Sequence, residues 1–487
     1  YEKEKKVGLR IIYGRAGSGK SEYCYKEIAK DIEKNEKIFL ITPEQFSFTA
    51  EKKLMEAVKT EAVLQAEVVH LSRLAKRVIK EIGIKDDRMS KCGKAMLISH
   101  ILTMQKKDLK YLSKSEENIN LAISSITELK KHGVTVEMLK EQIDKTENIY
   151  LKTKLQDISV IYEQYDEQIK QSYIDEADEL AILAENIENI KWLKNSVIYI
   201  DEFAGFTHQE YEIIKGLIKH AKQVNITICV DNLNPAINPD TDIYYSNKIT
   251  LYKLIDLVNE NNFKLEEPVF LKDQYRLKTK ELKHLANNIY EIQSTKYEEN
   301  VENIQLFLAK NPYSEIENIA KEIKKLVRDK KIRYKDISII TKNIDTYASL
   351  VRAIFKQYEI PVFIDEKRDL NQNIIIQYVL SILEILVRNF SSESVFSYIK
   401  LGFCEIDEDE IFKLENYCNK WGIKQNKWKK DFNIEAEDKS KKQEVERLNE
   451  LRKQIIMPLI ELKESIKKEK TAINITKSLY EFIQNQK

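Results

Sequence analysis

VGLRIIYGRAGSGKS, residues 7–21, is the stretch that decides the fold, because it joins an apolar run to a glycine-rich loop. The run at 7–13 predicts a buried strand, and SEYCYKEIAKDIEKN at 21–35 has the apolar spacing of a helix. KIFLITP at 37–43 predicts a second strand. Strand, loop, helix and strand in this order are typical of a parallel, doubly wound α/β sheet.

The loop itself matches the phosphate-binding pattern GxxxxGK[ST] at every fixed position. Glycines let backbone N–H groups approach phosphate oxygens, and the N-terminus of the following helix adds partial positive charge. Lys20 is expected at the β- and γ-phosphates, and the Ser21 hydroxyl is expected to bind Mg²⁺. The predicted nucleotide-binding residues are Gly14, Arg15, Ala16, Gly17, Ser18, Gly19, Lys20 and Ser21. The alternative interpretation is a glycine-rich turn with no ligand.

A second buried strand ends in two acids. VIYI at 197–200 is followed directly by Asp201 and Glu202. We expect Asp201 to be the magnesium carboxylate and Glu202 to be a candidate base for the attacking water. The alternative is an ordinary acidic pair at a strand end.

The composition indicates several domains and no membrane segment. The chain has 487 residues, which is too long for one core, and 80 Lys+Arg against 79 Asp+Glu give a net charge of +1. A phosphate-binding face would therefore have to be a local patch. The five cysteines are scattered without a CxxC pair, which argues against disulfides or zinc. With no apolar run of membrane length and no signal peptide, we expect a cytoplasmic protein.

Further along the chain the patterns alternate between sheet and helix. Residues 95–190 are helical almost throughout, and strands resume at 195–203 and 223–232. NIQLFLA at 303–309, ISIITK at 337–342 and IPVFID at 360–365 predict strands of a second α/β unit. Beyond about 370 the pattern is helical again.

Together these segments resemble the AddB family, subunits of the bacterial AddAB helicase–nuclease, and more broadly the superfamily 1 DNA helicases. The resemblance lies, in collinear order, on GRAGSGKS (14–21), FLITPEQFSF (39–48), VVHLSRLAKRVI (68–79), IYIDEFAGFTHQEYEII (198–214), QYRLKTKELKHLANNIY (274–290), YKDISIITKN (334–343) and YEIPVFIDEKR (358–368). It implies two RecA-like P-loop domains, each with a helical insertion. The implied first domain is 1–94 with 195–295 and its insertion is 95–194; the second domain begins at 296–390 and its insertion at 391–487.

The resemblance also implies a reaction and partners. Family members process double-stranded DNA ends for recombinational repair together with an AddA motor subunit, so ATP, Mg²⁺, duplex ends and single-stranded DNA are the expected ligands. The family's nuclease domain and iron–sulfur cluster lie far towards the C-terminus, and neither motif occurs here. We therefore expect an N-terminal fragment that does not cut DNA by itself.

Individual residues take expected roles from the resemblance. Tyr275 and Arg276 match the aromatic–arginine pair of helicase motif IV, which contacts the nucleotide base and the γ-phosphate. The family's loops that read the single-stranded Chi hotspot correspond to 42–48 and 70–76. The expected DNA-contacting residues are Gln45, Ser47, Leu71, Arg73, Lys76 and Phe206. At Lys76 a cation stands where an aromatic side chain is expected.

One departure from the family pattern bears on motor activity. The segment CVDNLNP at 229–235 lacks the Gln that active superfamily 1 helicases use to sense the γ-phosphate, whereas Glu202 keeps a candidate base. The sequence therefore favours a degenerate helicase-like module that binds nucleotide and reads DNA. An active ATP-driven helicase motor and an unrelated P-loop NTPase remain the alternatives.

Overall fold

The computed structural model describes residues 8–34, 36–58, 65–84, 87–112, 116–170, 173–236, 238–291, 293–366, 370–433 and 439–485. The chain forms two compact units, residues 1–306 and 307–487, and each is treated by itself. Within the described residues no helix is both long and apolar enough to cross a membrane.

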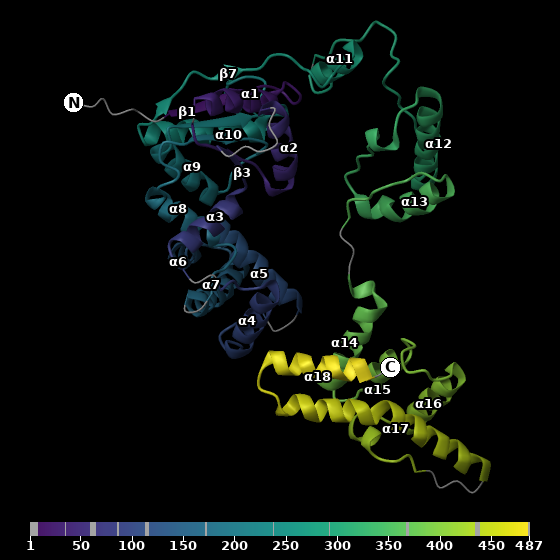
Figure 1. Cartoon of the computed structure of the whole chain (residues 1–487). Coiled ribbons are helices and arrows are strands. Elements are labelled where there is room, and N and C mark those ends of the chain that lie inside the picture. Colours follow the sequence, from purple (N-terminus) through teal and green to yellow (C-terminus); the bar gives the residue numbers. More distant parts are fainter. Residues whose placement is uncertain are drawn as a thin grey trace. The chain divides into compact units, whose positions relative to one another are not determined.

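The first unit is built on a parallel sheet (Figure 1). Its strands are β1 (Gly8–Tyr13), β2 (Ile38–Ile41), β3 (Ala66–Val69), β4 (Val197–Ile200), β5 (Gln223–Ile228), β6 (Lys264–Leu265) and β7 (Val269–Phe270). The strand order is β3-β2-β4-β5-β1, and β6 and β7 both pair with the outer side of β1. These strands pair in parallel throughout, so the predicted parallel α/β fold is confirmed.

Helices cover both faces of this sheet, because alternate side chains of each buried strand point to opposite faces. On β2, Ile38 and Leu40 pack with α1 (Lys20–Glu33) and α2 (Ser47–Val58). Phe39 and Ile41 belong to a separate core with α3 (Leu71–Glu81), α9 (His208–His220) and α10 (Tyr245–Glu260). The continuous apolar runs read in the sequence are the consequence of burial on both sides.

The block between β3 and β4 is helical, as predicted. It comprises α4 (Lys91–Met104), α5 (Glu116–Lys131), α6 (Val136–Lys145), α7 (Ile149–Lys170), α8 (Glu179–Asn186) and the 3-10 turn η2 (Ile187–Asn189). Helices α4 to α7 share a core of their own. Helix α8 instead packs in the sheet's core beside α3 and α9, so the last part of the expected insertion belongs physically to the sheet.

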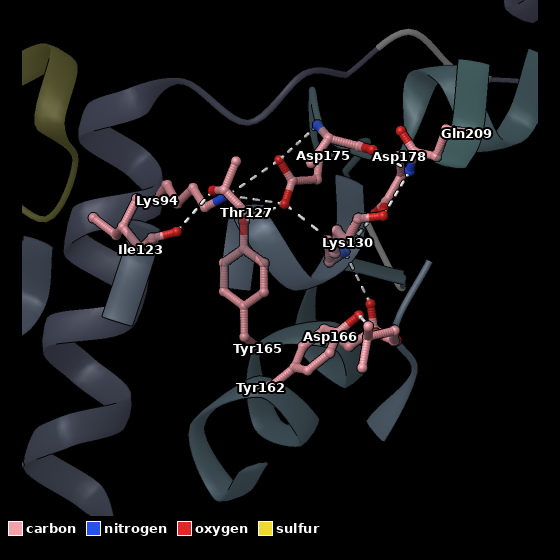
Figure 2. Close-up of polar contacts among 12 residues, drawn as sticks. Lys94, Ile123, Thr127, Lys130, Tyr162, Tyr165, Asp166, Asp175, Asp178 and Gln209 are labelled. Atoms are coloured by element: carbon pink, nitrogen blue, oxygen red, sulfur yellow. Dashed lines mark hydrogen bonds and ion pairs between the residues drawn. The ribbon is translucent and has the colours of Figure 1, made fainter. Parts of the chain in front are cut away.

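A buried polar network joins the helical block to the sheet (Figure 2). The Lys130 ammonium lies 2.6 Å from Asp178, 3.1 Å from Asp166 and 3.8 Å from Asp175, and Lys94 contacts Asp175 at 3.1 Å. At the start of α9 the Gln209 amide donates to the carbonyl oxygens of residues 130 (2.9 Å) and 177 (3.0 Å). The orientation of the block is thus fixed at the first turn of α9, the helix that follows β4 in the chain.

The second unit has two helical cores. One joins α12 (Pro312–Lys330) and α13 (Ile344–Gln357). The other joins α14 (Ile374–Val387), α15 (Ser392–Ile399), α16 (Glu408–Trp421), α17 (Lys439–Lys468) and α18 (Ala472–Asn485). Helix α14 precedes the domain boundary expected at 390, but it packs with the helices that follow that boundary. The remaining elements of the described residues are α11 (Lys280–Asn288) and the 3-10 turns η1 (Glu44–Phe46), η3 (Tyr334–Asp336), η4 (Leu370–Gln372) and η5 (Gln425–Lys429).

The strands expected in a second α/β unit are not formed. Residues 303–309, 337–342 and 360–365, all of them described, carry no strand, although helices α12 and α13 lie between them in the chain. Several of their apolar side chains face solvent: Leu308 is fully exposed, Ile340 is 94% exposed and Phe363 is 88% exposed. Ile360 is the contrary case, because it is 6% exposed and packs with α12 and α13. The sequence pattern marked segments able to pair, but a strand requires a hydrogen-bonded neighbour, and the described residues supply none.

Candidate functional site

Five strand ends bring the candidate residues to one edge of the sheet. Since β1, β2, β3, β4 and β5 are parallel, their carboxyl ends meet at the same edge, which is where ligands bind in open α/β sheets. The loop at 14–20 follows β1, the loop at 42–47 follows β2, and residue 70 follows β3. The acidic pair follows β4. The candidate phosphate site and the candidate DNA loops therefore share one edge.

The phosphate loop is shaped by glycines with left-handed backbone conformations. Gly17 has φ +82° and Gly19 has φ +84°, a region that favours glycine. A Cβ on Gly17 would lie 2.7 Å from the Cβ of Arg276. The Lys20 ammonium folds back over the loop and donates to the carbonyl oxygens of Gly14 (2.9 Å) and Arg15 (3.0 Å). Within the described residues its partners are neutral carbonyls alone, so an anion over the loop would compete for it.

The acids after β4 sit directly beside the loop. The Ser21 hydroxyl donates to Glu202 Oε1 at 3.0 Å, which ties the first turn of α1 to the end of β4. Asp201 is 2% exposed, and its Oδ1 accepts a 2.5 Å hydrogen bond from Thr227. Burial raises the pKa of Asp201 from its ordinary value, and the Thr227 hydrogen bond opposes that shift. Glu202 has φ +67°, a strained backbone for a non-glycine residue, and its side chain reaches Ser21 from this conformation.

These groups line a cavity of about 400 Å³. Sequence reasoning missed several of its residues: Tyr25, Lys53, Thr227, Cys229 and Asn247. Thr227 could have been found from the strand pairing, because β5 lies next to β4 with Ile226 opposite Ile200, which puts Thr227 beside Asp201. The other four come from helices and from the loop after β5, and no local pattern marks them.

The Tyr275–Arg276 pair lies against the phosphate loop, although the two segments are far apart in sequence. The backbone N–H groups of both residues point to the carbonyl oxygen of Gly17, at 2.9 and 3.4 Å. The Tyr275 ring is 68% exposed and passes so close to Gly19 that a Cβ there would lie 3.3 Å from it. Both side chains are therefore placed to meet a ligand bound at the loop.

The donor set fits a magnesium–nucleotide. Asp201 Oδ2 and the Ser18 hydroxyl are buried and have no hydrogen-bond partner in the described part of the chain, an arrangement that costs about 1–3 kcal/mol per group unless a ligand satisfies it. The Ser21 hydroxyl and the Asp201 carboxylate are oxygen ligands of the kind Mg²⁺ prefers, and phosphate oxygens and waters complete such shells. Within the described residues no three His, Cys, Asp or Glu side chains cluster as a metal site, so phosphate oxygens would have to complete any Mg²⁺ shell here.

The predicted DNA-contacting residues divide by exposure. Gln45 on η1, with Arg73 and Lys76 on α3, is exposed at the carboxyl edge. Ser47 is half-buried, and its hydroxyl donates to the carbonyl oxygen of Glu44 at 2.7 Å, which closes the 3-10 turn. Phe48, which was not singled out, is 78% exposed beside them.

Leu71 and Phe206 are packed to different degrees. Leu71 is 7% exposed within the sheet's core, so its side chain is engaged in packing rather than offered to a ligand. Phe206 is partly buried and contacts the rings of Phe203 (5.2 Å) and Tyr211 (5.6 Å). It lies in the short loop between the acidic pair and α9, and part of its surface is engaged in this packing.

The segment after β5 has its own electrostatic partners. Asp231 lies 3.4 Å from the ammonium of Lys248 and 4.0 Å from the Arg15 guanidinium. Cys229 lines the cavity. This segment therefore brings an acid to the glycine-rich loop, and residues 229–235 contain no Gln.

The fold and the site define an α/β protein with a parallel sheet and a phosphate-loop motif beside a buried carboxylate. Residues 11–286, more than half of the chain, match the protein family described as "ADDB, N-terminal", and the chain belongs to this family. Relatives named as the B-type subunits of an ATP-dependent helicase/deoxyribonuclease include those of Clostridium botulinum (strain Loch Maree / Type A3), at 37% identity, and Clostridium tetani, at 39%. The relative from Caldanaerobacter subterraneus is 37% identical.

The alignments cover nearly all of this chain and less than half of each relative. They include 98% of the chain with 43% of the C. botulinum protein, 98% with 44% of the C. tetani protein and 99% with 43% of the C. subterraneus protein. The chain thus spans less than half the length of these curated relatives.

Proposed function

We propose that this chain is the helicase-like, ATP-binding part of an AddAB-type helicase–nuclease, acting in DNA double-strand-break repair. Lys20 and the loop N–H groups hold the triphosphate, and Ser21 with Asp201 holds Mg²⁺. Tyr275 and Arg276 contact the base and the γ-phosphate. The observation that carries the proposal is the buried Asp201 oxygen, which has no partner among the described residues and belongs to the same cavity as Lys20 and Ser21.

The proposal extends to DNA reading at the same edge of the sheet. Gln45, Arg73 and Lys76 are exposed polar side chains on the turn and helix that follow β2 and β3, on the edge that also carries the nucleotide cavity. An amide can pair with a base edge, and the two cations can contact phosphate. In this proposal the loops read a single-stranded Chi-type hotspot, and an AddA-type partner supplies the main motor in the cytoplasm.

The second candidate function is an active, ATP-driven helicase motor. The contact between Glu202 and Ser21 favours it, because a carboxylate beside the magnesium serine is well placed to orient a water. The lack of a Gln at 229–235 favours the reading module. Membership of the AddB family argues against an unrelated P-loop NTPase.

ATP binding and turnover of the purified chain, with and without single-stranded DNA, separate these functions. We expect ATP–Mg²⁺ binding that Lys20→Ala weakens by about tenfold or more, since a charge-assisted contact to phosphate is lost, and turnover that DNA does not stimulate. Strong DNA-stimulated turnover that disappears in Lys20→Ala would make the chain a motor instead. ATP binding that Lys20→Ala leaves unchanged would contradict both functions.

A further inference from the structure

The distal end of the helical block carries an unusual concentration of lysine and tyrosine. Two segments meet there: residues 105–112, which follow α4, and residues 147–154, which include the first turns of α7. They contain five lysines, at 106, 107, 110, 152 and 154, against two acids, Asp108 and Glu147. In a chain whose net charge is +1, this is a local basic patch of the kind that a phosphate-binding face requires.

A buried acid holds the two segments together. Asp157 on α7 is 2% exposed, and its carboxylate accepts hydrogen bonds from the backbone N–H groups of Lys110, Tyr111 and Leu112, at 2.6–3.1 Å. Three backbone donors on one carboxylate fix the loop, so its side chains need little further ordering when a ligand binds. The Lys154 ammonium lies 6.0 Å from the centre of the Tyr111 ring, across the same junction.

The aromatic side chains of this end face solvent. Tyr111 is 56% exposed and Tyr150 is 86% exposed, with Ile149 and Leu151 also open beside it. Tyr150 and Lys154 are four residues apart on α7, so they occupy one helix face. None of the five lysines forms an ion pair with another described residue. Apart from the contact between Lys154 and Tyr111, the ring and ammonium groups are therefore available to a ligand.

We propose that this distal patch is a second contact for single-stranded DNA, with the lysines on phosphates and the tyrosines under unstacked bases. Lysine is depleted at protein–protein interfaces and is, with arginine, a main donor to phosphate oxygens, so the lysine content favours a nucleic acid over a partner protein. Exposed rings favour a single strand, whose bases can stack on them, over a duplex. The proposal rests on the proposed function only in taking DNA as the ligand.

The patch lies at the far end of α7 from the polar network. Along α7, Lys152 is about 20 Å from Asp166 in the network that fixes the block to the sheet. A strand that contacts both the loops at 42–48 and the distal patch would extend over the whole helical block. The orientation of the block would then determine the path of the strand.

The test is binding of a fluorescent single-stranded oligonucleotide and of a duplex of the same length, measured by anisotropy over a salt series. The variant Lys106→Ala/Lys107→Ala/Lys110→Ala should bind the single strand about tenfold more weakly at about 0.1 M salt, with a salt slope reduced by about two. The matched control Lys467→Ala/Lys468→Ala/Lys470→Ala removes the same charge from exposed lysines of the second unit and should have little effect. Equal losses in both variants would indicate only general attraction and overturn the proposal.

Stacking needs a separate variant. Tyr150→Ala should weaken single-strand binding by about tenfold and Tyr150→Phe should restore it, because the ring is kept. Unchanged binding in the triple-lysine variant, or a loss confined to the duplex, would refute the proposal. ATP binding measured on the same samples separates the outcomes: the distal variants should bind ATP normally, whereas failure of the proposed function would appear as absent ATP binding in the unmodified chain.

Discussion

Replacing Lys130 by methionine should destabilise the first unit more than any single surface change. The Lys130 side chain is 3% exposed and is the cation that Asp166 and Asp178 share. Methionine preserves most of the volume but leaves Asp178 without a cation among the described residues and leaves Asp175 with Lys94. Removing one partner of a buried ion pair costs about 3–5 kcal/mol. Because Asp166 and Asp178 are partly exposed, we expect a loss at the lower end, about 3 kcal/mol.

The loss is measured by urea unfolding, with hydrogen exchange of peptides from α5 and α7 as the local probe of the network. The control is Lys140→Met, which breaks an exposed pair with Glu163 (2.7 Å) and should cost less than about 1 kcal/mol. A loss below about 1 kcal/mol in Lys130→Met, equal to the control, would refute the view that the network is held by Lys130.

The pH dependence tests the electrostatic origin of the loss. Burial lowers the pKa of Lys130, but its carboxylate neighbours outweigh burial and leave that pKa raised. The contribution of Lys130 to folding stability is therefore complete below the ordinary lysine pKa and disappears as the pH rises through the raised value. Burial raises the pKa of Asp175, but Lys94 and Lys130 outweigh it and leave that pKa lowered, so its contribution disappears as the pH falls through the lowered value. The deficit of Lys130→Met should therefore shrink in acid. A deficit that is constant between neutral and acidic pH would point to packing instead.

Three further changes have defined outcomes. Gly17→Ala, which forces a side chain into a left-handed backbone and against Arg276, should cost about 1–3 kcal/mol and abolish tight ATP binding in a titration. Gln209→Ala, which leaves the carbonyl of residue 177 without its donor and that of residue 130 with the Gly133 N–H alone, should cost about 1–3 kcal/mol and speed hydrogen exchange near residue 130. Asp157→Asn should loosen residues 110–112 in hydrogen exchange while leaving ATP binding unchanged, and protection equal to the unmodified chain would contradict its role.

The sequence predicts those parts of the structure that depend on residues close together in the chain. The strand, loop and helix at 8–33 and the acids after β4 follow from apolar runs and from one spaced motif, and the structure brings them together as expected. Thr227 and Asn247 in the cavity, and the burial of Leu71, depend on which strands and helices become neighbours. No local pattern carries that information.

The polar network shows the same limit more sharply. Lys94, Lys130 and Asp175 come from three places in the helical block and carry no motif, so each reads in the sequence as a solvated charge. Their burial follows from tertiary packing alone, which brings Lys94 of α4, Lys130 of α5 and Asp175 from the segment after α7 together (Figure 2). In the second unit the opposite error occurs: apolar segments that read as strands have no hydrogen-bonded neighbour within the described residues.

The unpaired apolar segments at 303–309 and 337–342 have a consequence for the behaviour of the chain in solution. Leu306, Leu308 and Ile340 are more than 90% exposed on backbone that, in the described ranges, belongs to no sheet, which is the combination that promotes pairing between molecules. The chain should therefore self-associate as its concentration rises and should bind the dye ANS strongly. Replacing Leu308 and Ile340 by lysine should raise its solubility without touching the nucleotide cavity. The outer side of β1 is occupied by two short strands separated by a proline, so no continuous strand edge is left there for another molecule to pair with. The first unit should therefore crystallise more readily than the second.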